Sequence, residues 1–100
     1  GTNTNGAIDF AQGNAITSSY DCTGSPTLDN IRDGGSYTVV MTNTGTAKCD
    51  FSVNVGGTDD NGTVTYRYNP ANGLRTASSH TVYSMLRVGN IIYVSWISGF

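Results

Sequence analysis

The sequence predicts an all-β fold, and three observations support this prediction. The chain contains no Glu and a single Lys, whereas Thr, Ser, Asn and Gly are abundant. Glu, Lys, Leu and Ala are common on surface helices, whereas Thr, Val, Ile and Tyr favour strands. No stretch shows a sustained helical apolar period, and short alternating runs recur instead. A chain of 100 residues is long enough for one domain with a single modest core.

Turn-forming residues divide the chain into eight expected strands. Arg32-Asp33-Gly34-Gly35 offers residues that adopt positive φ before a strand, and Asp60-Asn61-Gly62 and Asn72-Gly73 are typical turn sequences. Gly89-Asn90 lies between two apolar runs and predicts a two-residue hairpin, of type II′ with Gly first. The expected strands are residues 7–10, 15–22, 27–31, 36–43, 48–55, 64–68, 80–88 and 91–97.

The expected strands differ in how their apolar residues are distributed. Strand 48–55 alternates cleanly and predicts one buried and one solvated face. The last strand is apolar on both faces, so it is either buried inside a single-chain sandwich or in contact with a second subunit. The small number of other large apolar residues favours a subunit contact. We expect Ile92, Val94 and Trp96 to face the core, and Ile91, Tyr93, Ile97 and Phe100 to meet a neighbouring chain.

Cys22 and Cys49 are the two cysteines of the chain. They do not form a Cys-x-x-Cys pair, and one His does not complete a zinc site with them. The alternatives are a reactive thiol or metal ligand, and a disulfide between two strands in an oxidising compartment. The sequence favours the disulfide, which stabilises by about 3 kcal/mol on the loop-entropy model.

Several classes of function are disfavoured by composition and motifs. A net charge of −2 argues against nucleic acid, and no apolar run is long enough for membrane insertion. One His and no Gly-x-Ser-x-Gly motif argue against a Ser–His–Asp triad. The pair Asp59-Asp60 lies in a Gly-rich turn without the oxygen spacing of a calcium loop. We therefore expect no enzyme, no metal and no cofactor.

The segment from residue 64 to residue 80 is the best candidate for ligand contact. Aromatic rings can stack on sugar rings, and amide and guanidinium groups donate hydrogen bonds to hydroxyls. The alternative is that these Tyr residues belong to a strand surface or a subunit interface. The candidate ligand-binding residues are Tyr66, Arg67, Tyr68, Asn72, Arg75 and His80.

Five segments carry a resemblance to a known group of proteins. They are DGGSYT (33–38), KCDF (48–51), YRYNP (66–70), TASSHTVYS (76–84) and IYVSWISGF (92–100). Together they resemble the C-terminal tip domains of phage-tail-fibre-like proteins, especially the mosaic adhesive trimer proteins of predatory, bdellovibrio-like bacteria. The resemblance extends over residues 33–100, and its most specific part is the closing Tyr-Val-Ser-Trp-Ile-x-Gly-aromatic series.

The resemblance implies an antiparallel β-sandwich-like protomer in a homotrimer at the distal end of an extracellular fibre. Residues 1–6 are then expected to be a linker from the fibre shaft, and residues 7–100 the tip domain. The expected function is a non-enzymatic adhesin that binds glycans or surface proteins of a prey or host cell envelope, with three weak sites acting by avidity. The alternative is a purely structural trimerisation and capping domain of a surface or phage tail fibre.

Overall fold

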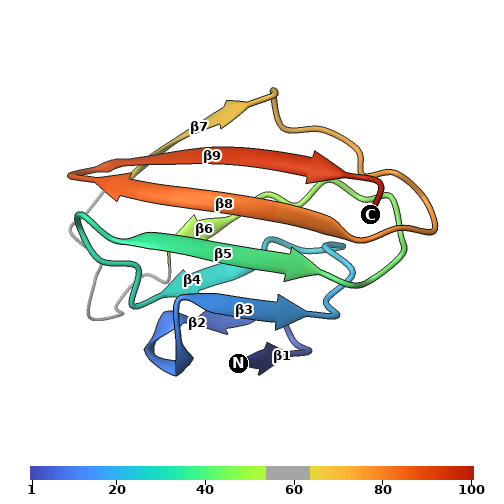
Figure 1. The fold of residues 1–100 in the computed structure, drawn as a ribbon, viewed down its shortest axis with the longest axis horizontal. Coiled ribbons are helices and arrows are strands. Elements are labelled where there is room, and N and C mark those ends of the chain that lie inside the picture. The colour runs from blue at the N-terminus through green and yellow to red at the C-terminus, as the bar shows by residue number, and fades with distance from the viewer. Residues whose placement is uncertain (54–63) are drawn as a thin grey trace.

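The computed structural model describes residues 1–53 and 64–100, and the regular secondary structure of these residues is almost entirely β (Figure 1). The predicted all-β class is confirmed, and each of the eight expected strands overlaps an observed strand. A further short strand, β1 (Thr2–Asn3), lies in the segment expected to be a linker. The turn at residues 60–62, the pair Asp59-Asp60 and the end of expected strand 48–55 lie outside the described residues.

The strands form two sheets that face each other. The long sheet has the strand order β1-β3-β5-β8-β9-β7, and the short sheet has the order β2-β4-β6. A 3-10 helix, η1 (Phe10–Gln12), follows β2, and Asp9 caps it by accepting a hydrogen bond from the Ala11 N–H. The remaining strands are β2 (Ala7–Asp9), β3 (Ala15–Ser18), β4 (Thr27–Asp29), β5 (Ser36–Met41), β6 (Ser52–Val53), β7 (Thr65–Asn69), β8 (Thr81–Val88) and β9 (Ile91–Ser98).

Residues 1–53 wind as three successive coils, each with one strand in either sheet. β1, β3 and β5 pair in parallel in the long sheet, and β2, β4 and β6 pair in parallel in the short sheet. Parallel neighbours made by successive turns of the chain are typical of a β-solenoid. The expectation of an antiparallel sandwich is therefore wrong for these coils. Turns such as residues 32–35 carry the chain from one sheet to the other and close no hairpin.

Residues 64–100 extend the long sheet beyond the third coil. β8 pairs antiparallel with β5 and with β9, and β7 adds to β9 in parallel. The predicted β8–β9 hairpin is confirmed, with Val88 opposite Ile91. Gly89 has a φ of +59°, and Asn90 is not among the residues with positive φ, as a type II′ turn requires.

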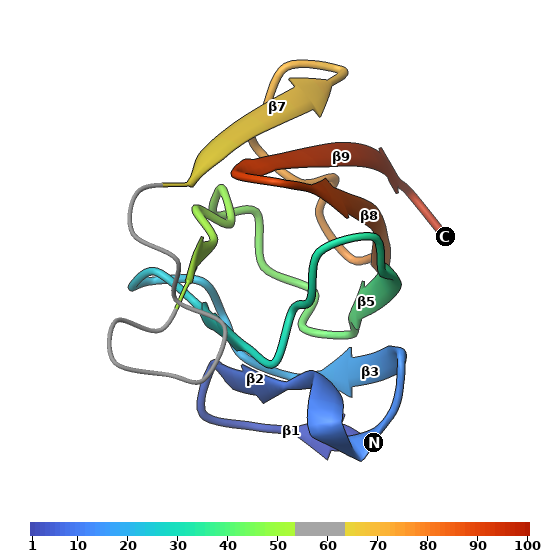
Figure 2. The same ribbon diagram turned by 90° about the vertical axis from the view of Figure 1, so that its left-hand side faces the viewer.

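The core lies between the two sheets, and the long sheet curves around the short one in the end-on view of Figure 2. Ile8 and Leu28 face inward from the short sheet. The prediction for β9 is confirmed, because Ile92 and Val94 are buried and Trp96 packs against the core with its ring 5.8 Å from that of Tyr83. The predicted alternation in the segment of β6 is also confirmed, with Cys49, Phe51 and Val53 buried.

The predicted disulfide between Cys22 and Cys49 is present. It joins the connection after β3 to the segment before β6, so it links the second coil of the chain to the third. Both cysteines are buried, and the described residues contain no free cysteine.

Candidate functional site

The outer face of the long sheet, which points away from the short sheet, carries side chains aligned in rows across the strands. Strand register places Ser95 of β9 opposite Ser84 of β8, Ser84 opposite Thr38 of β5, and Thr38 beside Ala15 of β3. All four side chains are small. This middle row therefore forms a low strip across four strands, and larger side chains stand on either side of it on β8 and β9.

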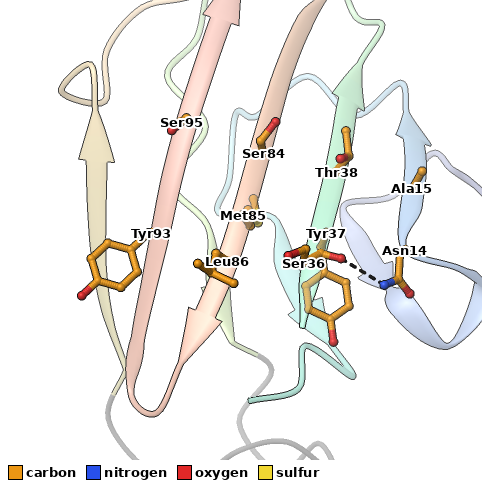
Figure 3. A pocket seen from close by; sticks show the side chains of 10 residues that line it. All are labelled: Asn14, Ala15, Ser36, Tyr37, Thr38, Ser84, Met85, Leu86, Tyr93 and Ser95. Carbon is orange, nitrogen blue, oxygen red and sulfur yellow. Dashed lines mark hydrogen bonds between the residues drawn. The ribbon is translucent and has the colours of Figure 1, made fainter. Parts of the chain in front are cut away.

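A groove of about 500 Å³ lies over the middle row, and Figure 3 shows the side chains that surround it. Tyr93 and Leu86 stand beside the strip, and Asn14 at the far side donates a hydrogen bond from Nδ2 to the Ser36 carbonyl at 3.0 Å. None of the residues that line the groove is charged. They are Asn14, Ala15, Ser36, Tyr37, Thr38, Ser84, Met85, Leu86, Tyr93 and Ser95.

Apolar side chains flank the groove at both ends of the strands. At one end, register aligns Ile97 with Val82 and Val82 with Val40. Phe100 lies at this same end, because its backbone exchanges hydrogen bonds of 2.9 and 3.1 Å with His80. Ile97 is 64% exposed and Phe100 is 67% exposed. We define these four apolar residues, Val40, Val82, Ile97 and Phe100, as the apolar end.

The four residues expected at a subunit contact do not form one continuous patch. Ile97 and Phe100 belong to the apolar end, whereas Tyr93 lines the groove. Ile91 lies beyond the groove, opposite Val88, and is half-buried. Their role in subunit contact stays a prediction.

The six residues expected to bind a ligand are spread over different environments. Tyr66 and Tyr68 stack on each other at 6.1 Å and pack against the core from the inner side of β7. Arg67 alternates with them, is exposed, and lies opposite Tyr93 in register. Asn72 is half-buried and donates to the Cys49 carbonyl and to Oδ1 of Asp50, and the exposed His80 precedes β8.

Arg75 is buried, with only 3% of its surface exposed. Its Nε donates to the Ala47 carbonyl at 2.7 Å, Nη1 to the Asn43 carbonyl at 2.9 Å, and Nη2 to the Asp21 carbonyl at 3.0 Å. A guanidinium offers five N–H donors in a fixed plane, which suits it to several carbonyls at once. Arg75 therefore connects two loops of the fold and does not present its charge to a ligand.

Burial also disfavours ionisation of the tyrosines of β7. Burial raises the pKa of Tyr68 to about 12, and a hydrogen bond from the Phe51 N–H opposes this shift in part. Burial likewise raises the pKa of Tyr83 to about 12 and raises the pKa of Tyr66. Because burial disfavours the charged phenolate, these side chains are neutral at physiological pH.

Metal-binding clusters and membrane-spanning helices are absent from residues 1–53 and 64–100. No group of three or more His, Cys, Asp or Glu side chains in these ranges is placed to hold a metal ion. No helix among the described residues is long and apolar enough to cross a bilayer. Comparison of the chain with protein-family models, curated proteins and solved structures finds no match.

Most of the groove residues were not among the sequence candidates. Ser84, Ser95 and Thr38 come from three strands, and only the register of the sheet brings them together. The sequence nevertheless contained a pattern that indicates the groove. On the outer faces of β8 and β9, Ser84 and Ser95 are small polar residues within otherwise apolar and aromatic series, which marks a depression in an apolar surface.

Proposed function

We propose that this chain is a non-enzymatic, extracellular adhesin domain that recognises glycans or surface proteins on the envelope of a prey or host bacterium. The observation that carries this proposal is the uncharged groove on the outer face, lined by hydroxyls and bordered by the half-exposed ring of Tyr93. Concave sites with aromatic walls and a few convergent polar groups are the usual form of ligand-binding sites.

An extracellular location is supported by the disulfide and by the composition. Disulfides persist in oxidising compartments and are rare in the cytosol. Charged residues make up only 12% of the chain, so its solubility depends on hydroxyl and amide groups. The resemblance of residues 33–100 to fibre-tip domains also favours an extracellular location.

We further propose that the domain assembles as a homotrimer through the apolar end. Ile97 and Phe100 expose most of their apolar surface in the single chain, and Val82 continues this surface across the sheet. Removing apolar surface from water stabilises association by roughly 25 cal/mol per Å². A trimer would present three grooves, so weak binding at each groove would combine into strong retention on a repetitive surface.

The adhesin function predicts retention on bacterial envelopes. The labelled, non-reduced domain is mixed with washed envelopes of several Gram-negative and Gram-positive bacteria and with a broad glycan array. We expect saturable retention on at least one envelope and competition by the unlabelled domain. A correctly assembled trimer that binds no envelope and no array glycan would instead favour the structural capping domain.

The homotrimer predicts a mass in solution of about three times the 10.5 kDa chain mass by light scattering at micromolar concentration. Ile97→Asp places a charge in the proposed contact, so we expect the mass of a monomer. Val88→Asp is the matched control, because Val88 is also an exposed apolar residue of the outer face but lies at the opposite end of the strands. A wild-type monomer, or equal effects of the two variants, would contradict this assembly.

A further inference from the structure

We propose that the groove binds a neutral saccharide chain that lies across the strands, with Tyr93 as the stacking residue. This inference rests on the proposed adhesin function and specifies its ligand class and its site. It also assigns Tyr93 to ligand binding, whereas the sequence placed Tyr93 at the subunit contact and placed the stacking tyrosines on β7.

The shape of the groove favours an extended ligand that runs perpendicular to the strands. Its floor is the middle row, which crosses β9, β8, β5 and β3. Four strands spaced by about 4.8 Å give a floor roughly 14 Å long, which is long enough for a short oligosaccharide. A peptide that adds to a sheet pairs with an edge strand and runs parallel to the strands, so it would not follow this groove.

The charge of the groove favours a neutral ligand. The residues that line it are Ser, Thr, Asn, Tyr, Ala, Leu and Met, and none carries a charge. Arg67 lies outside the lining, on β7 opposite Tyr93. Anionic ligands are recognised by several convergent cationic or N–H groups, which this lining does not supply. Hydroxyls both donate and accept, so Ser84 and Ser95 match the hydroxyls of a sugar.

Tyr93 is the groove residue best placed to hold the apolar face of a sugar ring. Its side chain is 45% exposed, and Figure 3 shows its ring leaning from β9 toward β7, at the edge of the groove on the side away from Leu86. Tyr66 and Tyr68 pack against the core, so neither offers an open ring face of this kind. The ring of Tyr93 and the hydroxyls of Ser84 and Ser95 together provide the apolar and polar contacts that a sugar needs.

Titration calorimetry with short neutral hexose and N-acetylhexosamine oligosaccharides, chosen by the glycan array, tests this assignment. Tyr93→Ala removes the ring, and Ser84→Leu fills the floor, so we expect each to weaken binding by about tenfold or more. Tyr93→Phe keeps the ring and should stay within about threefold of wild type. Thr17→Leu adds the same side chain to the same face outside the groove lining and should leave the affinity unchanged.

The outcomes separate the saccharide site from the adhesin function. Wild-type affinity in Tyr93→Ala and Ser84→Leu would overturn the site and leave the adhesin function standing. Binding only to acidic glycans or to an envelope protein would also overturn the saccharide site and leave the adhesin function standing. Loss of the trimer mass in Tyr93→Ala would show that Tyr93 belongs to the subunit contact and would overturn its assignment to the groove. Absence of binding to every glycan and every envelope would refute both proposals. Thermal unfolding of each variant shows whether it is folded.

Discussion

Replacing Arg75 by Met is expected to destabilise the domain by about 3–5 kcal/mol, which is a large part of the stability of a small domain. Met keeps the apolar part of the side chain and removes the guanidinium. The carbonyls of Asp21, Asn43 and Ala47 would then lose their donors in a partly buried site. A buried acceptor without a partner costs about 1–3 kcal/mol, and hydrogen bonds from charged donors are the stronger ones.

Urea unfolding monitored by Trp96 fluorescence measures this effect as a lower midpoint at unchanged slope. Arg67→Met is the matched control, because Arg67 is an exposed Arg of β7, and its loss should change stability by less than about 0.5 kcal/mol. Arg75→Lys keeps the charge but not the planar set of donors, so its urea midpoint should fall between those of Arg75→Met and Arg67→Met. Equal midpoints for Arg75→Met and Arg67→Met would show that the three carbonyls find other partners.

The parts of the fold that the sequence predicted are those set by local rules. Gly89-Asn90 determines a hairpin because only a few residue pairs adopt the required positive φ, and the structure has this turn. The alternation of Cys49, Phe51 and Val53 determined which face is buried. Side chains on successive strand residues point to opposite faces, so such a pattern can be read without knowing the neighbouring strand.

The direction of strand pairing was not predictable from the same patterns. A strand has a side-chain period of two whether its neighbour is parallel or antiparallel, so alternation carries no information on direction. The turn at residues 32–35 illustrates this ambiguity. It resembles a hairpin turn in sequence, but it joins β4 of the short sheet to β5 of the long sheet. Its position is set by distant contacts, such as the hydrogen bond from the Gly89 N–H to Asp33 at 2.7 Å.

The candidate site was harder to predict, because proximity in sequence differs from proximity on the surface. Tyr66, Arg67 and Tyr68 are adjacent, but strand alternation places the tyrosines on the inner side and the Arg on the outer face. Arg75 looked like a ligand contact because buried Arg is uncommon, and its three carbonyl partners come from distant loops. Conversely, the groove joins small residues from separate strands, which no local pattern groups together.

Removing the disulfide is expected to destabilise the domain by about 3 kcal/mol. Cys22 and Cys49 are separated by 27 positions, and the bond limits the unfolded chain by closing this loop. Ala is the suitable replacement at both positions, because the sites are buried and a hydroxyl there would need a partner. Urea unfolding of the double Ala variant, compared with the oxidised and reduced wild-type domain, measures the loss. A reductant should lower the wild-type midpoint and leave the variant unchanged, and an unaffected wild-type midpoint would contradict the predicted contribution.

The disulfide and Arg75 act on the same two loops, so their contributions should not be additive. Asp21, which accepts from Arg75, precedes Cys22 directly, and Ala47, another acceptor, lies two residues before Cys49. Once the disulfide is absent, these loops can separate and their carbonyls can reach water, so Arg75→Met should cost less in the double Ala background. A double-mutant cycle should therefore give a coupling of about 0.5–3 kcal/mol, with the combined loss smaller than the two single losses together. Additive losses would mean that Arg75 holds its three carbonyls in place without help from the covalent link.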